Sequence, residues 1–181
     1  MEDRILLEIV RKSIQEEFYK QTLIDRNSLI EKYPEFKNLG ATFVTLNLDG
    51  KLRGCIGSLV AHRALLEDII HNAKAAAFGD PRFPKLTLEE FEKVQVELSI
   101  LTTPKALEYI DFEDLKQKLV PNKHGVILEL DGKRATFLPQ VWEQLTDFNT
   151  FMVHLVQKAG LNPSKLSTYP KIQTYEVQKI K

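Results

Sequence analysis

The chain has 181 residues, of which 43% are hydrophobic and one is a cysteine, and its 25 Lys and Arg balance 25 Asp and Glu. This length fits one domain that can bury a core without a disulfide or a structural metal. A net charge of zero gives no electrostatic reason to expect a nucleic acid or a membrane surface as a partner. Because no apolar run is long enough for a membrane span and the first residues do not resemble a signal peptide, we expect a cytoplasmic protein.

The first half of the chain predicts helices on either side of a β-hairpin. Apolar residues recur at every fourth position from Leu6 to Phe18, as in an amphipathic helix. Asp49-Gly50 is a two-residue hairpin turn between two β-rich segments, and Gly79 is placed to end a helix. The expected elements are a helix over 3–20, a short helix over 28–32, strands over 41–48 and 51–57, and a helix over about 62–78.

The second half predicts a further strand, a second hairpin and more helices. Thr87 and Glu90 have the spacing of a capping box, and Asp131-Gly132 repeats the hairpin turn. Two such turns require antiparallel strand pairs, so the predicted fold class is α+β, with a mainly antiparallel sheet and packed helices. The expected elements are a rigid loop at 80–84, a short helix after 87, a strand over 94–100, a helix over 111–119, a hairpin over 126–138, helices over 140–145 and 147–159, and a strand over about 172–180.

The only cysteine, Cys55, lies in the segment "LRGCIGSL" (52–59). Glycines stand on both sides of it, at positions 54 and 57, and glycine in a strand lets a backbone or a ligand approach closely. This setting permits two interpretations. Cys55 is either the reactive centre of a site or a small buried hydrophobic residue, as free cysteines often are.

The pairing of the hairpin bears on that choice. Regular pairing across the Asp-Gly turn puts Arg53 opposite Leu46 and Cys55 opposite Val44, with the Arg53 and Cys55 side chains on one face. A guanidinium beside a thiol favours the thiolate, which is the nucleophilic form. A β-bulge at Gly54 would shift the pairing by one residue and separate the two side chains.

Five short motifs stand out: "LRGCIGSL" (52–59), "DPRF" (80–83), "VELSIL" (96–101), "HGVIL" (124–128) and "FLPQVW" (137–142). Together they resemble the AMMECR-one domain family, also labelled AmmeMemoRadiSam system protein A. The resemblance runs from about residue 3 to the last strand and implies one domain over 1–181, with a larger and a smaller subdomain. It also implies a pathway link to Memo-type and radical-SAM proteins, because the genes of similar bacterial and archaeal proteins lie near theirs. It implies no defined reaction.

The resemblance and the strand pattern together select the candidate site. Glu97 and Ser99 lie on the polar face of their predicted strand, and if that strand neighbours the hairpin they would share a face with Cys55. The alternative is an ordinary solvated sheet face with an Arg53–Glu97 salt bridge. The Asp80–Arg82 loop has a similar alternative, in which Asp80 only ties its own backbone. The expected catalytic residues are Cys55, Arg53 and Glu97, and the expected ligand-binding residues are Gly54, Gly57, Asp80, Arg82, Ser99 and His124.

No metal and no cofactor are expected, because the chain has neither an HExxH nor a CxxC pattern. Two functions stay open. The first is an enzyme or enzyme-like protein with a cleft around Cys55 that binds an unknown small molecule and uses thiolate chemistry. The second is a non-enzymatic protein-binding or scaffold module in which Cys55 is structural.

Overall fold

The computed structural model describes residues 3–181. It divides into two compact units, Met1–Leu101 with Gln178–Lys181, and Thr102–Val177. Each unit has its own β-sheet and its own hydrophobic core. Helices and mainly antiparallel strands are present in both, which confirms the predicted α+β class.

The first unit is a five-stranded sheet covered by two long helices. The strand order is β2-β1-β4-β9, and the short β3 also pairs with β1. Its elements are α1 (Asp3–Tyr19), α2 (Arg26–Lys32), the 3-10 turn Pro34–Lys37, β1 (Leu39–Leu48), β2 (Lys51–Gly57), β3 (Arg63–Ala64), α3 (Leu65–Phe78), α4 (Leu88–Lys93), β4 (Gln95–Leu101) and β9 (Val177–Ile180).

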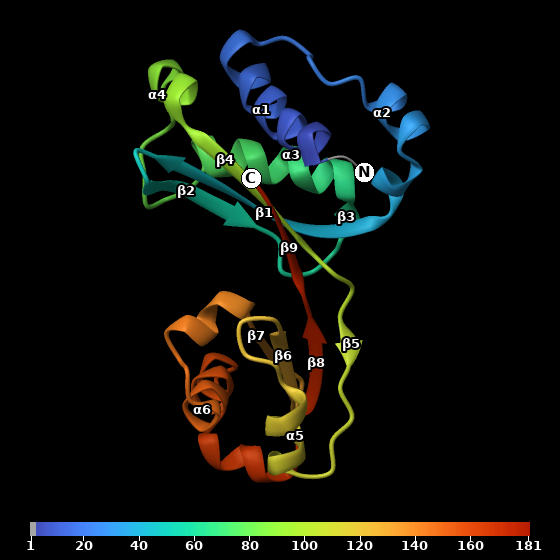
Figure 1. Ribbon diagram of the computed structural model, residues 1–181, viewed down its shortest axis with the longest axis vertical. Helices are drawn as coiled ribbons and strands as arrows, with labels where there is room; N and C mark the ends of the chain where they lie inside the picture. Colours follow the sequence, from blue (N-terminus) through green and yellow to red (C-terminus); the bar gives the residue numbers. More distant parts are fainter. Residues whose placement is uncertain (1–2) are drawn as a thin grey trace. The chain divides into compact units, whose positions relative to one another are not determined.

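Helices α1 and α3 lie on one face of this sheet (Figure 1). Alternate residues of the central strands point towards them and are fully buried, including Val44, Leu46 and Leu98. The helices contribute an apolar stripe, represented by Ile14 of α1 and Ile69 of α3. The opposite face of the sheet is therefore the one that is free to carry polar side chains.

The second unit is a four-stranded sheet in the order β5-β8-β6-β7. Helix α6 packs on it in Figure 1, and Trp142 stacks on Phe151 of α6 with ring centroids 3.7 Å apart. Its elements are β5 (Lys105–Ala106), α5 (Phe112–Lys118), β6 (Gly125–Leu130), β7 (Lys133–Phe137), the 3-10 turns Pro139–Glu143 and Pro163–Thr168, α6 (Phe148–Lys158) and β8 (Lys171–Tyr175).

Two predicted boundaries differ from the structure for physical reasons. The helix expected over 62–78 starts at Leu65, because the two preceding residues pair with β1 as β3. The strand expected over 172–180 is two strands that belong to different sheets, with a break at Glu176. The apolar residues of this segment stand at 172, 175, 177 and 180, so they do not alternate regularly, and the single strand expected there is wrong.

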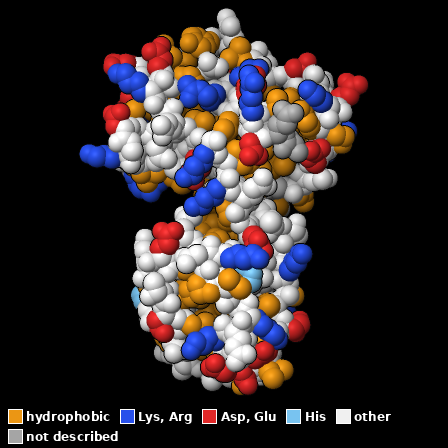
Figure 2. Space-filling view, in the orientation of Figure 1, with side chains coloured by type: hydrophobic (Ala, Val, Ile, Leu, Met, Phe, Trp, Pro, Cys, Tyr) orange, Lys and Arg blue, Asp and Glu red, His pale blue; other side chains and the backbone are white. Residues whose placement is uncertain are grey.

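The surface carries both signs of charge. Lys and Arg side chains are interspersed with Asp and Glu side chains on the face shown in Figure 2. Within residues 3–181, every helix is too short or too polar to cross a bilayer.

Candidate functional site

The β1–β2 hairpin contains a β-bulge. Next to the turn the strands pair regularly, as far as Asn47 opposite Leu52, but Leu46 then pairs with Gly54. Arg53 is therefore the extra residue of the bulge. The predicted pairing of Leu46 with Arg53 is wrong by one position.

The bulge is explained by which face of β1 is buried. Val44 and Leu46 point into the core. Regular pairing would place Arg53 and Cys55 on that apolar face, where an unpaired guanidinium is costly. The extra residue brings a glycine and Ile56 to the core instead, and Ile56 packs against the core cluster.

Cys55 consequently lies on the polar face, in a row that crosses three strands. It pairs with Thr45 of β1, and Thr45 pairs on its other side with Glu97 of β4. Directly opposed residues point to the same face, so their side chains are neighbours. The Cys55 Sγ lies 3.4 Å from the Thr45 Oγ1, and the Glu97 carboxylate lies 3.0 Å from the Nζ of Lys181.

The Asp80–Arg82 loop binds the outer edge of β2 at Cys55. The Cys55 N–H donates to the Asp80 Oδ2 (2.9 Å), and the Arg82 Nη2 donates to the Cys55 carbonyl oxygen (3.1 Å). Asp80 also accepts from the Arg82 N–H and guanidinium, so it ties its own loop, as the alternative interpretation of this loop predicts. These side chains cover the edge of β2 that a further strand would otherwise pair with.

The charges of this loop support one another. The hydrogen bond from Arg82 holds the pKa of Asp80 well below 3.8; burial opposes this effect and the Cys55 N–H adds to it. In return, the hydrogen bonds to Asp80 raise the pKa of the Arg82 guanidinium above its ordinary value, and burial opposes this effect. Asp80 is 4% exposed, whereas the Arg82 side chain is 54% exposed. Arg82 is therefore the cation that a ligand at Cys55 can reach.

Arg53 is engaged elsewhere. Its Nε and Nη2 donate to the two carboxylate oxygens of Glu90 on α4, at 2.9 and 2.8 Å. Glu90 completes a capping box with Thr87, and the pKa of Glu90 falls to about 2, mainly because of Arg53 and then the Thr87 N–H. The Arg53–Glu97 salt bridge considered as an alternative is absent from the ion pairs of residues 3–181, where Arg53 pairs with Glu90. The pair joins α4 to β2, and a catalytic role of Arg53 stays a prediction.

The two glycines of the motif lie against protein atoms. A Cβ on Gly54 would stand 2.3 Å from the Ala76 carbonyl oxygen of α3, and a Cβ on Gly57 would meet the Phe43 ring at 2.2 Å. Both glycines thus permit close packing within the unit, and their predicted ligand contact is untested. Ser99 pairs with Phe43 on the polar face, in the row next to that of Cys55, and is buried.

His124 belongs to the other compact unit. Its Nδ1 accepts from the Val120 N–H (3.2 Å), and its carbonyl oxygen accepts from the Trp142 indole (3.0 Å). Burial lowers the pKa of His124 below 6.5, although Glu176 opposes this effect. These contacts give His124 a structural explanation within its own unit.

Sequence reasoning missed three neighbours of the candidate site. Thr45 was hidden by the pairing error, and Lys181 by its distance along the chain from Glu97. Glu90 was identified only as part of a capping box. The buried face of β1 could have revealed Thr45. A pairing that puts Arg53 in the core is excluded, and the shifted pairing brings Cys55 opposite Thr45.

A buried polar cluster behind β1 was also missed. Asp68 of α3 is fully buried and accepts from the Thr42 N–H and hydroxyl, the Ser58 hydroxyl and the Asn72 amide. The Arg63 Nε lies 3.0 Å from its Oδ1. This cluster fixes the start of α3 to β1 and to the chain just after β2. Within residues 3–181, no group of three His, Cys, Asp or Glu side chains is arranged to hold a metal ion.

Comparison with known proteins identifies the family. The AMMECR1 family model matches residues 7–180. Protein MJ0810 of Methanocaldococcus jannaschii is 38% identical over 161 residues, which cover 86% of this chain and 80% of that protein. Protein Mbar_A1807 of Methanosarcina barkeri is 33% identical over 180 residues, covering 98% of this chain and 89% of that protein.

A solved structure is similar over almost the whole chain. The crystal structure of the uncharacterized protein PH0010 from Pyrococcus horikoshii matches with a TM-score of 0.76 and 30% identity, covering 97% of this chain and 88% of that one. The family model, the archaeal relatives and this structure each match most of the chain. The chain belongs to the AMMECR1 family.

Proposed function

We propose that the polar face around Cys55 is a small-molecule site in which the Cys55 thiolate is the nucleophile. The observation that carries the proposal is the row Cys55–Thr45–Glu97, which places the sulfur 3.4 Å from a hydroxyl with a carboxylate one strand further on. Nucleophilic cysteines need a nearby base and a positive charge. Glu97, on the far side of Thr45 in this row, would be the base, and Arg82, which donates to the Cys55 carbonyl oxygen, would supply the positive charge.

The residues would have distinct roles in an attack on an electrophilic carbon. The Cys55 sulfur adds to a carbonyl carbon, whose π bond breaks and leaves its electron pair on the carbonyl oxygen, while the thiol proton passes to the Glu97 carboxylate through the Thr45 hydroxyl. Arg82 stabilises negative charge on the thiolate. Asp80 acts as a positioning residue, because it holds the Cys55 N–H and the Arg82 guanidinium together. The substrate class is left open.

Alkylation by iodoacetamide tests this proposal directly, because Cys55 is the only cysteine and mass spectrometry of the intact chain reports on it alone. We expect alkylation of the folded protein at neutral pH, and a severalfold lower rate in Arg82→Gln and Glu97→Gln. Glu92→Gln is the matched control, since Glu92 is exposed on α4 and outside the row. A thiol that reacts only after unfolding in urea would overturn the proposal.

A second candidate is a non-enzymatic protein-binding or scaffold module, in which Cys55 is structural. It is favoured by the packing of Gly54 and Gly57 against the chain's own atoms. If this alternative holds, Cys55→Ala keeps both the activity of the pathway and the binding of a protein partner. If Cys55 is the nucleophile, Cys55→Ala abolishes the reaction. Both candidates include a cytoplasmic location, which the lack of a membrane-length apolar run supports, and a link to Memo-type and radical-SAM proteins, which the family resemblance supports.

A further inference from the structure

The sheet of the second unit has a face that points away from its core. Leu128, Ala135 and Ile172 of strands β6, β7 and β8 are buried in one cluster with the apolar residues of α6. The neighbours of these residues along each strand point to the opposite face. That face carries four exposed charged side chains, which are Arg134, Glu129, Lys171 and Glu108.

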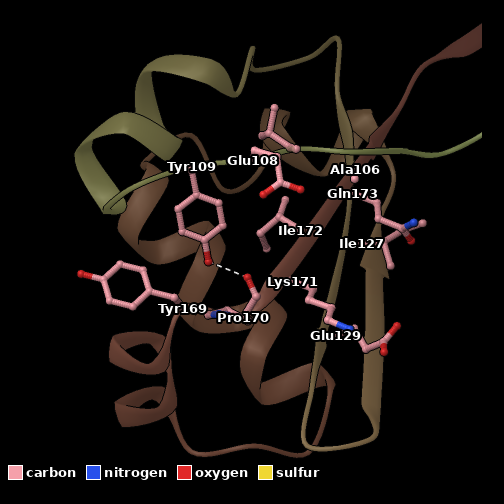
Figure 3. Close-up of a pocket in the computed structure, with 11 residues that line it drawn as sticks. Ala106, Glu108, Tyr109, Ile127, Glu129, Tyr169, Pro170, Lys171, Ile172 and Gln173 are labelled. Carbon is pink, nitrogen blue, oxygen red and sulfur yellow. Dashed lines mark hydrogen bonds between the residues drawn. The ribbon is translucent and has the colours of Figure 1, made fainter.

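Three of these side chains stand in a row across neighbouring strands. Arg134 of β7 pairs with Glu129 of β6, and Glu129 pairs on its other side with Lys171 of β8. Directly opposed residues point to the same face, so the three side chains are neighbours. Figure 3 shows the Lys171 side chain directed towards Glu129.

Glu108 continues the row on the far side of β8. The Leu107 N–H donates to the Ile172 carbonyl oxygen, which extends the antiparallel pairing of β5 with β8 by one residue. The next residue, Glu108, therefore lies opposite Lys171. The charged row, from Arg134 to Glu108, reads positive, negative, positive, negative over three strand spacings, about 14 Å.

The charges of this row are available to a partner. Among residues 3–181, none of the four takes part in an ion pair within 4.0 Å, and Arg134 donates only to the uncharged Gln173 (3.4 Å). Lys118 also reaches this edge of the sheet, where its Nζ donates to the Glu108 carbonyl oxygen. Its charge is paired with the Asp114 carboxylate (2.8 Å), so it leaves the alternation of the row unchanged.

The order of the charges makes the row complementary to a second copy of itself. A two-fold axis parallel to the strands, between β6 and β8, reverses the row across an interface. Arg134 then faces the second copy's Glu108, and Glu129 faces the second copy's Lys171, so all four contacts join opposite charges. An axis along the row would place each residue opposite its own copy and make all four contacts repulsive.

We propose that this face is the interface of a symmetric dimer, in which two copies of the sheet pack face to face with their strands aligned. Exposed ion pairs each contribute little, so the dimer is weak and salt dissociates it. The pocket of about 480 Å³ lined by Glu108, Glu129 and Lys171 (Figure 3) would hold water between the copies, as polar interfaces do. This inference is independent of the thiol chemistry proposed for Cys55.

Sedimentation velocity of the full chain over a range of concentrations is the first test. We expect a monomer–dimer equilibrium at about 0.1 M NaCl and dissociation at about 1 M NaCl, which shortens the Debye length from about 10 Å to about 3 Å. A chain that stays monomeric at the lower salt concentration, or a dimer that salt leaves unchanged, would overturn the inference.

Two charge-reversal variants test the assigned axis. In a dimer of Glu129→Lys, or of Lys171→Glu, two of the four contacts join like charges, so each variant alone should dimerise at least about tenfold more weakly. In a mixture of the two variants, all four contacts of the heterodimer again join opposite charges. The mixture should therefore dimerise as well as the natural chain, and this recovery would also show that both variants are folded.

A matched control separates the row from general surface charge. Glu113→Lys makes the same change of charge on an exposed residue of α5, outside the row, and should leave the dimer unchanged. The inference is overturned if the mixture of Glu129→Lys and Lys171→Glu stays monomeric, or if Glu113→Lys weakens the dimer as much as Glu129→Lys does.

Discussion

The two hairpins of this chain have the same turn sequence but differ in how their strands pair beyond the turn. Leu-Asp-Gly-Lys occurs at 48–51 and at 130–133, and both turns have the same left-handed geometry, with φ near 51° at Asp and 72–74° at Gly. The β6–β7 hairpin pairs regularly from Leu130–Lys133 to Val126–Phe137. The β1–β2 hairpin contains the bulge at Arg53.

The difference lies in the residues that would face the core. Regular pairing in the second hairpin puts Ala135 opposite the buried Leu128, so both residues of this pair are apolar. Regular pairing in the first would put Arg53 opposite the buried Leu46. In the first hairpin the turn therefore sets only the first two pairs of residues, and burial sets the rest. In this chain, the bulge is what moves Cys55 from the core to the polar face.

Deleting one residue from each hairpin gives the largest contrast. Deletion of Arg134 shifts Phe137 to the polar face and brings Thr136 opposite Leu128, so we expect the free energy of unfolding to fall by about 3–5 kcal/mol. Deletion of Arg53 removes the extra residue together with its ion pair to Glu90, but the pairing of Gly54 with Leu46 survives, so we expect the smaller loss. Urea unfolding measures the loss in the free energy of unfolding for each variant. A larger loss for the Arg53 deletion than for the Arg134 deletion would contradict this explanation of the bulge.

The next largest difference should come from the residue opposite the buried leucine of each hairpin, which is Gly54 opposite Leu46 and Ala135 opposite Leu128. Gly54→Ala brings a Cβ to 2.3 Å from the Ala76 carbonyl, a backbone atom that cannot move aside, and should cost about 3 kcal/mol. Ala135→Gly, the reverse change at the equivalent place in the regular hairpin, should cost only about 1 kcal/mol. Thermal unfolding compares the two, and an unchanged Tm for Gly54→Ala would contradict the close packing of α3 on β2.

The third largest effect on stability should come from breaking the ion pair between the bulge residue Arg53 and Glu90. Glu90→Gln leaves the nearly buried Arg53 without its partner and weakens the capping box, at a cost of about 2–3 kcal/mol. Glu89→Gln, which changes an exposed carboxylate of the same helix, is the control and should cost less than about 0.5 kcal/mol. The double variant, Glu90→Gln with Arg53 deleted, should lose no more free energy of unfolding than the more damaging single change. Additive losses would contradict the ion pair between Arg53 and Glu90.

The same pair predicts a dependence on pH, the smallest of these effects. The folded-state pKa of Glu90 is about 2, below its ordinary value of 4.5. The unfolded chain therefore binds this proton first, so the stabilisation is complete above pH 4.5 and is lost as the pH falls towards 2. The stability difference between the natural chain and Glu90→Gln should narrow over that range, and a constant difference would contradict the assigned cause.

Much of the fold could be predicted from local sequence patterns. Apolar spacing located α1 and α3, the Asp-Gly pairs located both turns, and Thr87 with Glu90 located the start of α4. The site was less predictable. That Glu97 shares a face with Cys55 could be anticipated from alternation, but Glu90 as the partner of Arg53 depends on packing between segments far apart in sequence.

Two features lay beyond local reasoning. The change of sheet at Glu176 depends on which core each strand fills, Tyr175 in one unit and Ile180 in the other. The cluster around Asp68 joins residues from β1, α3 and the chain after β2, so no single segment of the sequence contains it.

The position of Cys55 can be measured directly by NMR. Its N–H and C=O bind Asp80 and Arg82 and so point away from β1, which makes Thr45–Cys55 a non-hydrogen-bonded pair with closely spaced Hα atoms. We expect a strong Hα–Hα NOE between Thr45 and Cys55. An NOE between Val44 and Cys55 in its place would put the thiol on the core face and contradict the proposed site.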